Sequence, residues 1–136
     1  MAELRVLRDE ARPYAECPNC QTRLELPTLD GTRWTIRSPR DVADRLIVSM
    51  AGLEQEELRV VVLNTKNVVM AVVTVYRGNV SSSLVRVGEL FRDAVRLNAS
   101  GIILVHNHPS GDPTPSPDDL HLTAEALAAG RLLDID

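Results

Sequence analysis

The chain has 136 residues, of which 44% are hydrophobic and 25% charged, and its formal net charge is −4; these totals are typical of one globular domain. No apolar run approaches the roughly 18 residues of a membrane span, and the charged N-terminus lacks the apolar core of a signal peptide, so we expect a cytoplasmic protein without a membrane partner. The acidic balance argues against a general electrostatic grip on nucleic acid, which requires clustered basic charge.

The first part of the chain, residues 1–37, follows neither the helical nor the strand periodicity of apolar residues, and prolines interrupt it. We therefore expect an irregular N-terminal segment, followed by the main domain over residues 38–136. Within the segment, two short strands at Leu24–Leu26 and Arg33–Ile36 are predicted around a turn at Thr28–Gly31.

Cys17 and Cys20 are the two cysteines of the chain, and their spacing is that of half a zinc knuckle. A structural zinc site needs four ligands, so three interpretations stay open. The pair is a relic or a reduced surface turn, or it shares a zinc ion with a second copy across a homodimer, or it forms a local disulfide or redox pair. A cytosolic setting disfavours the last of these.

A helix start is predicted at Ser38-Pro39-Arg40-Asp41, where serine is the N-cap, proline takes the first helical position and aspartate lies in the first turn. Gly52 suits the end of this helix. The apolar residues that recur at helical spacing, and that should face the core, are Val42, Leu46, Ile47 and Met50.

Two apolar runs then predict a buried antiparallel hairpin, with strands at Leu58–Leu63 and Val68–Tyr76 joined by a turn at Asn64–Asn67. A second helix is predicted over Val87–Ala99. Its inward-facing positions should be Leu90, Ala94, Val95 and Leu97.

The apolar run Gly101–Val105 is typical of a short buried strand, and it leads into His106 and His108. Side chains alternate between the two faces of extended backbone, so both histidines should point the same way. Two imidazoles side by side at a strand end are a natural pair of metal ligands. The other interpretation is two structural histidines at a turn.

A proline-rich loop follows and ends at Ser116-Pro117-Asp118-Asp119, a second helix start with the same chemistry as the first. It places Asp119 in the first helical turn, where the carboxylate can turn back toward His106 and His108. Two histidines and one aspartate leave a fourth position free for water, which is the arrangement of a catalytic rather than a structural zinc.

The helix that starts at Pro117 is predicted to run to about Ala129 and to close at Gly130, and Arg131–Asp136 then predicts the beginning of another strand. The order of helix, hairpin, helix, strand, helix and strand predicts an α/β (α+β) sandwich, in which a mixed and mostly antiparallel sheet is flanked by helices. Three polar residues near the metal motif are not expected to be ligands. Asp112 is interpreted as a turn residue, Asp118 as a complement to the helix dipole and His121 as an exposed side chain.

Taken together, His106-x-His108, ten further residues and Asp119, with Ser116 three residues before it, resemble the JAMM motif of JAB/MPN-type metallopeptidases. The fuller string His-Asn-His-Pro-Ser-Gly-Asp-Pro-Thr-Pro-Ser resembles the RadC branch of that superfamily, and the resemblance runs from about Ser38 to the C-terminus. It implies a JAB/MPN-like fold with cytidine-deaminase-like layering, a Zn²⁺ ion on the two histidines and the aspartate, and cleavage of a peptide or isopeptide bond in a protein or peptide. Similar proteins usually continue with a further strand, so the domain is expected to be short at its C-terminal end.

A zinc ion at such a site lowers the pKa of a bound water from about 15.7 toward about 7, and a general base must take the water's proton. The resemblance places this base beside the first sheet strand, where Glu56 is the best match and Glu54 and Glu57 are the alternatives; a solvated connector is the plain interpretation of this acidic run. Ser116 can cap the helix by accepting from the backbone N–H near Asp119. The resemblance adds a second role for its hydroxyl, stabilisation of the developing oxyanion.

Two departures from the resembling proteins bear on function. Val87-Gly88-Glu89 stands where they often carry Pro-Arg-Glu, and residues 1–37 contain no helix-hairpin-helix pattern, which weakens a DNA-binding role. The alternative function is a RadC-type accessory or binding module associated with DNA repair, with a structural or vestigial metal site. A third interpretation is hydrolysis of a non-peptide amide or a nucleic-acid linkage at the same zinc.

Overall fold

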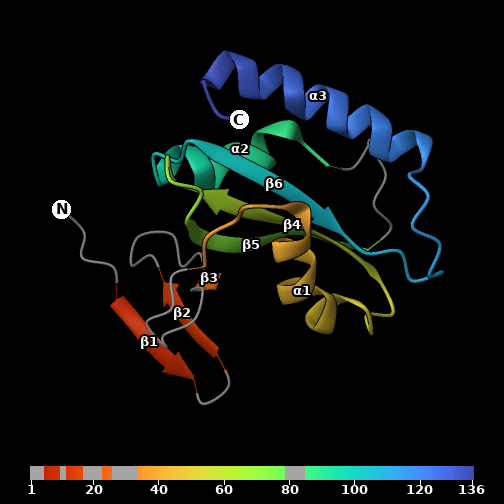
Figure 1. The fold of residues 1–136 in the computed structure, drawn as a ribbon, viewed down its shortest axis with the longest axis horizontal. Helices are drawn as coiled ribbons and strands as arrows, with labels where there is room; N and C mark the ends of the chain where they lie inside the picture. Colours follow the sequence, from red (N-terminus) through yellow and green to blue (C-terminus); the bar gives the residue numbers. More distant parts are fainter. Residues whose placement is uncertain (1–4, 10–11, 17–22, 26–33, 79–84) are drawn as a thin grey trace.

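The computed structural model describes residues 5–9, 12–16, 23–25, 34–78 and 85–136, which contain six strands and three helices (Figure 1). The strands form one sheet in the order β1-β2-β3-β5-β4-β6, and neighbouring strands are antiparallel throughout. The elements are β1 (Arg5–Asp9), β2 (Arg12–Glu16), β3 (Arg23–Glu25), α1 (Pro39–Met50), β4 (Glu56–Leu63), β5 (Val69–Gly78), α2 (Val87–Arg96), β6 (Gly101–His106) and α3 (Pro117–Leu133).

β4 lies between β5 and β6, and its residues from Glu57 to Leu63 are all buried because helices cover both faces of the sheet. Leu58 and Val60 pack in a core with α2 and α3, whereas Val61 and Leu63 pack in a second core with α1. Figure 1 shows the same arrangement, with α1 on one face and α2 and α3 on the other. The α/β sandwich predicted from the sequence is confirmed.

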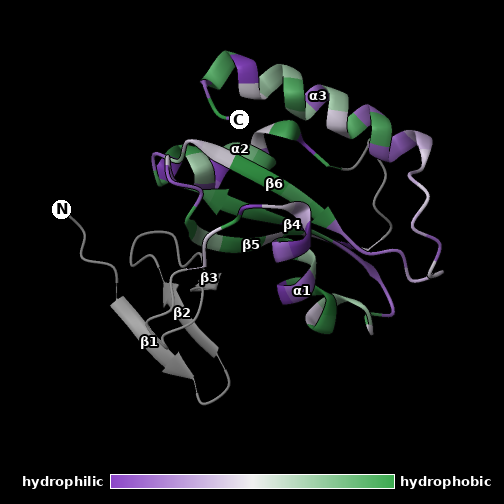
Figure 2. Cartoon of the chain, viewed as in Figure 1, coloured by the Kyte–Doolittle hydropathy of each residue, from purple (hydrophilic) through white to green (hydrophobic). Residues whose placement is uncertain are grey.

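Hydropathy follows these layers. Figure 2 shows β4 and β6 as mainly hydrophobic, and the ribbon becomes hydrophilic where β6 passes into the following loop. The change marks the place where the chain leaves the core and carries polar side chains at the edge of the sheet. Within the described residues, no helix combines the length and the apolar character needed to cross a membrane.

The predicted hairpin is confirmed, with β4 and β5 joined by a turn that begins at Asn64. The Asn64 side-chain oxygen accepts hydrogen bonds from the backbone N–H groups of Lys66 (2.9 Å) and Val68 (3.0 Å). Asn67 adopts a left-handed backbone with φ of 55°, a conformation that asparagine tolerates better than most residues. Turn chemistry written in the sequence therefore fixes the register of the two strands.

α1 begins where the sequence predicts, and the Ser38 N–H donates to the Asp41 carboxylate at 2.8 Å. Ile47 is 58% exposed, so the prediction that it faces the core is wrong. Each residue turns the helix by about 100°, and this step from Leu46 carries Ile47 past the edge of the contact with the sheet. The buried apolar residues of α1 are Val42, Leu46 and Met50.

α2 ends at Arg96, short of the predicted end at Ala99, because Asn98 turns into the left-handed region with φ of 52°. Val95 is 55% exposed and was wrongly predicted to face the core, whereas Phe91, which is 3% exposed, was overlooked. The predicted inward positions that the structure confirms as core residues or as packed against the core are Leu90, Ala94 and Leu97.

β1 and β2 form a hairpin in a part of the chain that the sequence predicts to be irregular. A proline weighs against a strand, because it has no N–H to donate to a neighbour. Pro13 nevertheless pairs with Arg8 of β1, and it lies outside residues 14–16, the part of β2 that pairs with β3. The N–H that proline lacks is therefore not needed for the pairing of β2 with β3.

β3 covers part of the strand predicted at Leu24–Leu26, but it pairs with β5 through Glu25 and Val72. Thr35, in the other predicted strand, forms an isolated bridge with Val68 instead. Within the residues that the structure describes, the two predicted strands therefore pair with β5 and with Val68, not with each other. The predicted turn at Thr28–Gly31 and the Cys17–Cys20 pair lie outside the described residues.

α3 continues through Gly130 to Leu133, so the predicted helix end at Gly130 and the predicted strand start at Arg131 are both wrong. Gly130 has a packing role: a Cβ at this position would stand 2.5 Å from the Ile135 carbonyl oxygen. Asp134, with φ of 52°, ends the helix. The chain then returns to β6, where the backbone of Asp136 accepts from Ile102 (2.7 Å) and donates to Ser100 (3.0 Å), the hydrogen-bond pattern of a parallel pair.

Candidate metal centre

His106 and His108 lie at the end of β6 on the face that packs against α2 and α3. His106 pairs with Leu58 of β4, and paired side chains lie on the same face of a sheet. Leu58 belongs to the core beneath α2 and α3, which fixes the direction of His106. The Nε2 atoms of the two histidines are 2.8 Å apart, so the imidazoles converge as their spacing predicts.

Asp119 reaches the histidines from the first turn of α3. Its Oδ1 lies 3.2 Å from His106 Nε2, and its Oδ2 lies 3.5 Å from His108 Nε2. Oδ2 also accepts from the backbone N–H and the hydroxyl of Ser116, both at 2.7 Å. The helix cap therefore engages Oδ2, whereas Oδ1 faces His106.

A backbone contact sets the tautomer of His108. Its Nδ1 meets the carbonyl oxygen of Asp112, and a carbonyl can only accept, so Nδ1 carries the proton. The lone pair of His108 is then on Nε2, the atom that faces His106 and Asp119. Hydrogen bonds of this kind orient metal-binding histidines. The Asp112 carboxylate accepts from the Thr114 N–H at 2.9 Å, in agreement with its interpretation as a turn residue.

Asp119 is held in its ionised form. Burial would raise its pKa, but hydrogen bonds from the hydroxyl and backbone N–H of Ser116, with help from the nearby histidines, outweigh this effect and lower the pKa below its usual value of 3.8. A carboxylate must be ionised to bind a metal ion. The cap therefore gives Asp119 both its position and its charge.

The three residues fit a divalent cation such as zinc. One donor atom from each lies within 4.8 Å of the other two, and this is the group that the described residues offer for a metal ion. Donors about 2.0–2.1 Å from a tetrahedral zinc stand about 3.3 Å apart; the two Nε2 atoms are 2.8 Å apart and Asp119 Oδ1 lies 3.2 Å from His106 Nε2, both close to that value. The side chains of His106, His108 and Asp119 are 28%, 18% and 11% exposed, respectively.

The histidines also line a cavity of ≈ 210 Å³, together with Gly111, Asp112 and Pro113. This cavity gives the cluster a side that water or a substrate can approach. Three protein donors with one open side match a catalytic zinc site, since structural sites fill all four positions with protein.

The structure separates the three acids that the sequence offers as a general base. Glu57 and Arg59 point to the α1 face, where Glu57 is 1% exposed and bonded to Arg59 at 2.7 Å. Glu56 is the neighbour of Glu57, so the alternation of the strand puts it on the face of Leu58 and His106. Glu56 and His106 are then diagonal neighbours across two strands, a relation that spans about 7–8 Å. Glu54 precedes β4 and is exposed.

Ser116 performs the capping role predicted for it. Its Oγ accepts from the Asp119 N–H at 3.1 Å and donates to Asp119 Oδ2 at 2.7 Å. Its second predicted role, on a developing oxyanion, stays a prediction. His121 is 63% exposed and lies 3.6 Å from Glu125, one turn along α3, which agrees with its interpretation as an exposed side chain.

Asn107 was given no role from the sequence. It stands between the two histidines, and its side chain contacts the backbone of Gln55 and Glu57, on both sides of Glu56. Strand periodicity gave no signal for these contacts, because they join Asn107 to backbone atoms 50 and 52 residues away.

Comparison with known proteins agrees with this geometry. Residues 36–136 match the family model described as RadC-like JAB domain. The chain is 55% identical over 104 residues to a UPF0758 protein of Roseiflexus castenholzii, with 76% of this chain and 45% of the relative covered. It is 56% identical to a UPF0758 protein of Chloroflexus aurantiacus with the same coverage. A UPF0758 protein of Moorella thermoacetica is 48% identical over 105 residues, 77% of this chain and 46% of the relative. The chain thus spans a little under half the length of these relatives.

Proposed function

The chain belongs to the family of RadC-like JAB domains, and from this premise we propose that it is a zinc-dependent hydrolase that cleaves a peptide or isopeptide bond in a protein or peptide substrate. The observation that carries the proposal is the convergence of His106, His108 and Asp119 on one point beside an open cavity. Glu56 shares the face of this cluster, so a base and a metal site stand together.

The chemistry divides between the metal and the chain. A zinc ion held by His106, His108 and Asp119 would supply a Lewis acid and a water of lowered pKa. Glu56 takes the proton of the attacking water and passes it to the nitrogen of the leaving amine, so that one amide and one water give a carboxylic acid and an amine. The Asp112 carbonyl keeps the His108 ring in the tautomer that leaves Nε2 free throughout.

Ser116 supports the reaction in two ways under this proposal. It holds Asp119 ionised and oriented, through the hydrogen bonds already described. Its hydroxyl is also the donor that would turn from Asp119 Oδ2 to the oxygen of the substrate carbonyl as negative charge develops there. A single donor of this kind is worth about 10²–10³ in turnover in other hydrolases.

The metal site is tested by mass spectrometry of protein purified without an affinity metal. We expect about one zinc per chain in the wild type, none in His108→Ala, and an unchanged content in His121→Ala. His121 is the matched control because it is an exposed histidine outside the cluster. Zinc that survives in His108→Ala, or a wild type that binds none at micromolar zinc, would contradict the proposal.

The reaction is tested on the zinc-loaded chain with a proteome-derived peptide library, in which new amino termini are counted by mass spectrometry. Glu56→Gln should lower cleavage by about 10²–10⁴-fold and retain zinc, whereas Glu125→Gln, which changes an exposed acid on α3, should alter neither. A zinc-loaded wild type that cleaves no peptide and no isopeptide-linked conjugate would favour the binding-module alternative. Salt-dependent binding of duplex DNA at physiological ionic strength would then support the DNA-repair association.

A further inference from the structure

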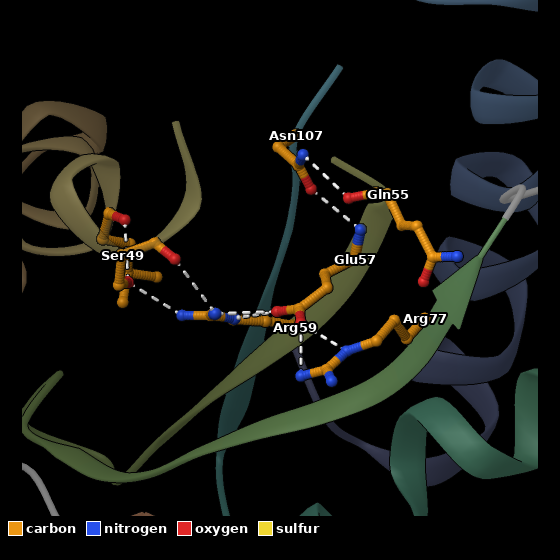
Figure 3. A network of polar contacts seen from close by, with 7 residues as sticks. Ser49, Gln55, Glu57, Arg59, Arg77 and Asn107 are labelled. Atoms are coloured by element: carbon orange, nitrogen blue, oxygen red, sulfur yellow. Dashed lines mark hydrogen bonds and ion pairs between the residues drawn. The ribbon is translucent and has the colours of Figure 1, made fainter. Parts of the chain in front are cut away.

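The pairing of β4 with β6 stops at the metal centre, and a side chain continues it. The last backbone pair is Leu58 with His106. Beyond that point the Asn107 Oδ1 accepts from the Glu57 N–H at 2.8 Å, and the Asn107 Nδ2 donates to the Gln55 carbonyl oxygen at 3.2 Å (Figure 3). A carboxamide carries the same donor and acceptor as a peptide unit, so Asn107 supplies the next rung of the ladder.

The two backbone groups that Asn107 holds belong to the residues on either side of Glu56. Fixing the Gln55 carbonyl and the Glu57 N–H leaves little freedom for the backbone of the residue between them. Glu56 projects to the face of Leu58 and His106, whereas Asn107 bonds to backbone groups in the plane of the sheet. One side chain therefore ties the strand end that carries the histidines to the strand start that carries the acid.

A second set of contacts fixes the same strand start from the α1 face. The Glu57 carboxylate accepts from Arg59 at 2.7 Å and from Arg77 of β5 at 2.6 Å. Arg59 also donates to the Ser49 hydroxyl of α1 at 2.8 Å. Figure 3 shows Asn107 and these charged side chains meeting at Glu57 from different elements. The backbone at Glu57 is thus anchored through both its N–H and its side chain.

We infer that Asn107 is a positioning residue, which acts through Glu56 by fixing the start of β4 against the histidine pair. This inference rests on the proposed function in assigning Glu56 as the general base. Without the Asn107 amide, the backbone on either side of Glu56 loses the two hydrogen bonds that tie it to the β6 side of the sheet beyond Leu58, and Glu56 moves relative to His106. A displacement of about 1 Å in a catalytic group costs on the order of 100-fold in turnover.

The first arm of the test uses the metal-free chain and amide hydrogen exchange. Asn107→Ala should raise the exchange rate of the Glu57 N–H by at least about tenfold, because its half-buried acceptor is lost. Asn107→Asp keeps that acceptor and should leave the Glu57 N–H protected. The matched control is Asn64→Ala, which removes an asparagine with two backbone contacts at the far end of β4 and should leave Glu57 unchanged.

The second arm is a double-mutant cycle between Asn107→Ala and Glu56→Gln. In the wild-type background Asn107→Ala should lower kcat about 100-fold with little change in KM; in the Glu56→Gln background it should lower kcat no further. The same cycle can be measured without a substrate from the absorption spectrum of Co²⁺ bound in place of zinc. The two single variants and the double variant should all show the same spectral shift relative to the wild type. Asn64→Ala should leave the spectrum unchanged.

The outcomes separate the two claims. A wild type that binds Co²⁺ and hydrolyses nothing, yet shows the expected exchange and spectral cycle, would end the hydrolase proposal and leave the positioning role in place. Additive effects of the two substitutions, or a Glu57 N–H that exchanges equally in wild type and Asn107→Ala, would overturn the positioning role even if the wild type is an active hydrolase.

Discussion

The two faces of the sheet hold the same components and use them differently. Each face has a helix that begins with Ser-Pro-x-Asp, and each receives one glutamate from the start of β4. On the α1 face these are Asp41 and Glu57; on the α3 face they are Asp119 and Glu56. What differs is the side chain that an acid meets: Glu57 meets arginine on the α1 face, and Asp119 meets histidine on the α3 face.

The partner decides what each acid can do. Asp41 uses its Oδ2 in the helix cap, where it accepts from the N–H groups of Arg37 and Ser38, both at 2.8 Å. Asp119 makes the same cap, but its Oδ1 meets His106 at 3.2 Å. An arginine neutralises a buried carboxylate permanently, whereas a neutral histidine leaves it free to share a metal ion. The comparison predicts that substitutions on the α1 face cost stability and those on the α3 face cost function.

The largest expected effect is the contrast between the two adjacent glutamates. Glu56→Gln should lower turnover by about 10²–10⁴-fold, the usual contribution of a positioned general base, and should leave the free energy of unfolding nearly unchanged. Peptide cleavage assays and urea denaturation measure both properties on the same protein. Unchanged turnover in Glu56→Gln, with zinc bound, would show that Glu56 is not the general base, although strand alternation places it on the histidine face.

Glu57→Gln should show the reverse pattern. It leaves Arg59, whose side chain is 8% exposed, without its charged partner, and breaking a buried pair in this way costs about 3–5 kcal/mol in unfolding free energy. Replacing both partners, as in Glu57→Leu with Arg59→Met, should recover much of that loss because no charge is left buried. A Glu57→Gln chain as stable as the wild type in urea would contradict a structural role for this pair.

The stability difference between wild type and Glu57→Gln should also depend on pH. Burial opposes ionisation of Glu57, but the hydrogen bonds and charges of Arg59 and Arg77 outweigh it and hold the pKa below its ordinary 4.5. Because the folded pKa is depressed, the stabilisation is fully present above the unfolded value and is lost as the pH falls through the folded value. Denaturation between about pH 7 and about pH 3 should therefore show the two proteins converging at the acid end. A stability difference that widens on acidification would contradict a depressed pKa for Glu57 in the folded state.

Those parts of the fold that depend on neighbours in sequence could be predicted. The cap of α3, the turn at Asn64 and the direction of His106 and His108 follow from spacings of a few residues, and the structure agrees with each. Gly130 shows the limit, since its role is set by the return of Ile135 against it, and a helix-ending glycine has the same local signature.

The choice between Glu56 and Glu57 needed the sheet itself. An acidic run gives no register by its own composition, and only the pairing of Leu58 with His106 shows which of the two shares the histidine face. Arg59 and Arg77 explain why the other acid can be buried; Arg59 is two residues away on the same strand, but Arg77 lies 20 residues away and is brought in by the sheet. Asn107 was invisible for the same reason, because its partners lie 50 and 52 residues away.

The smallest expected effect compares the two caps directly. Ser38→Ala and Ser116→Ala each remove the hydroxyl of a Ser-Pro-x-Asp start, and each should cost about 1 kcal/mol of unfolding free energy. Only Ser116→Ala should also weaken zinc affinity, by about tenfold, since it removes a hydrogen bond that orients a metal ligand. Chelator competition measures the affinity and urea denaturation the stability. Equal zinc affinity in the two variants would mean that the cap on the α3 face, like the one on the α1 face, serves its helix alone.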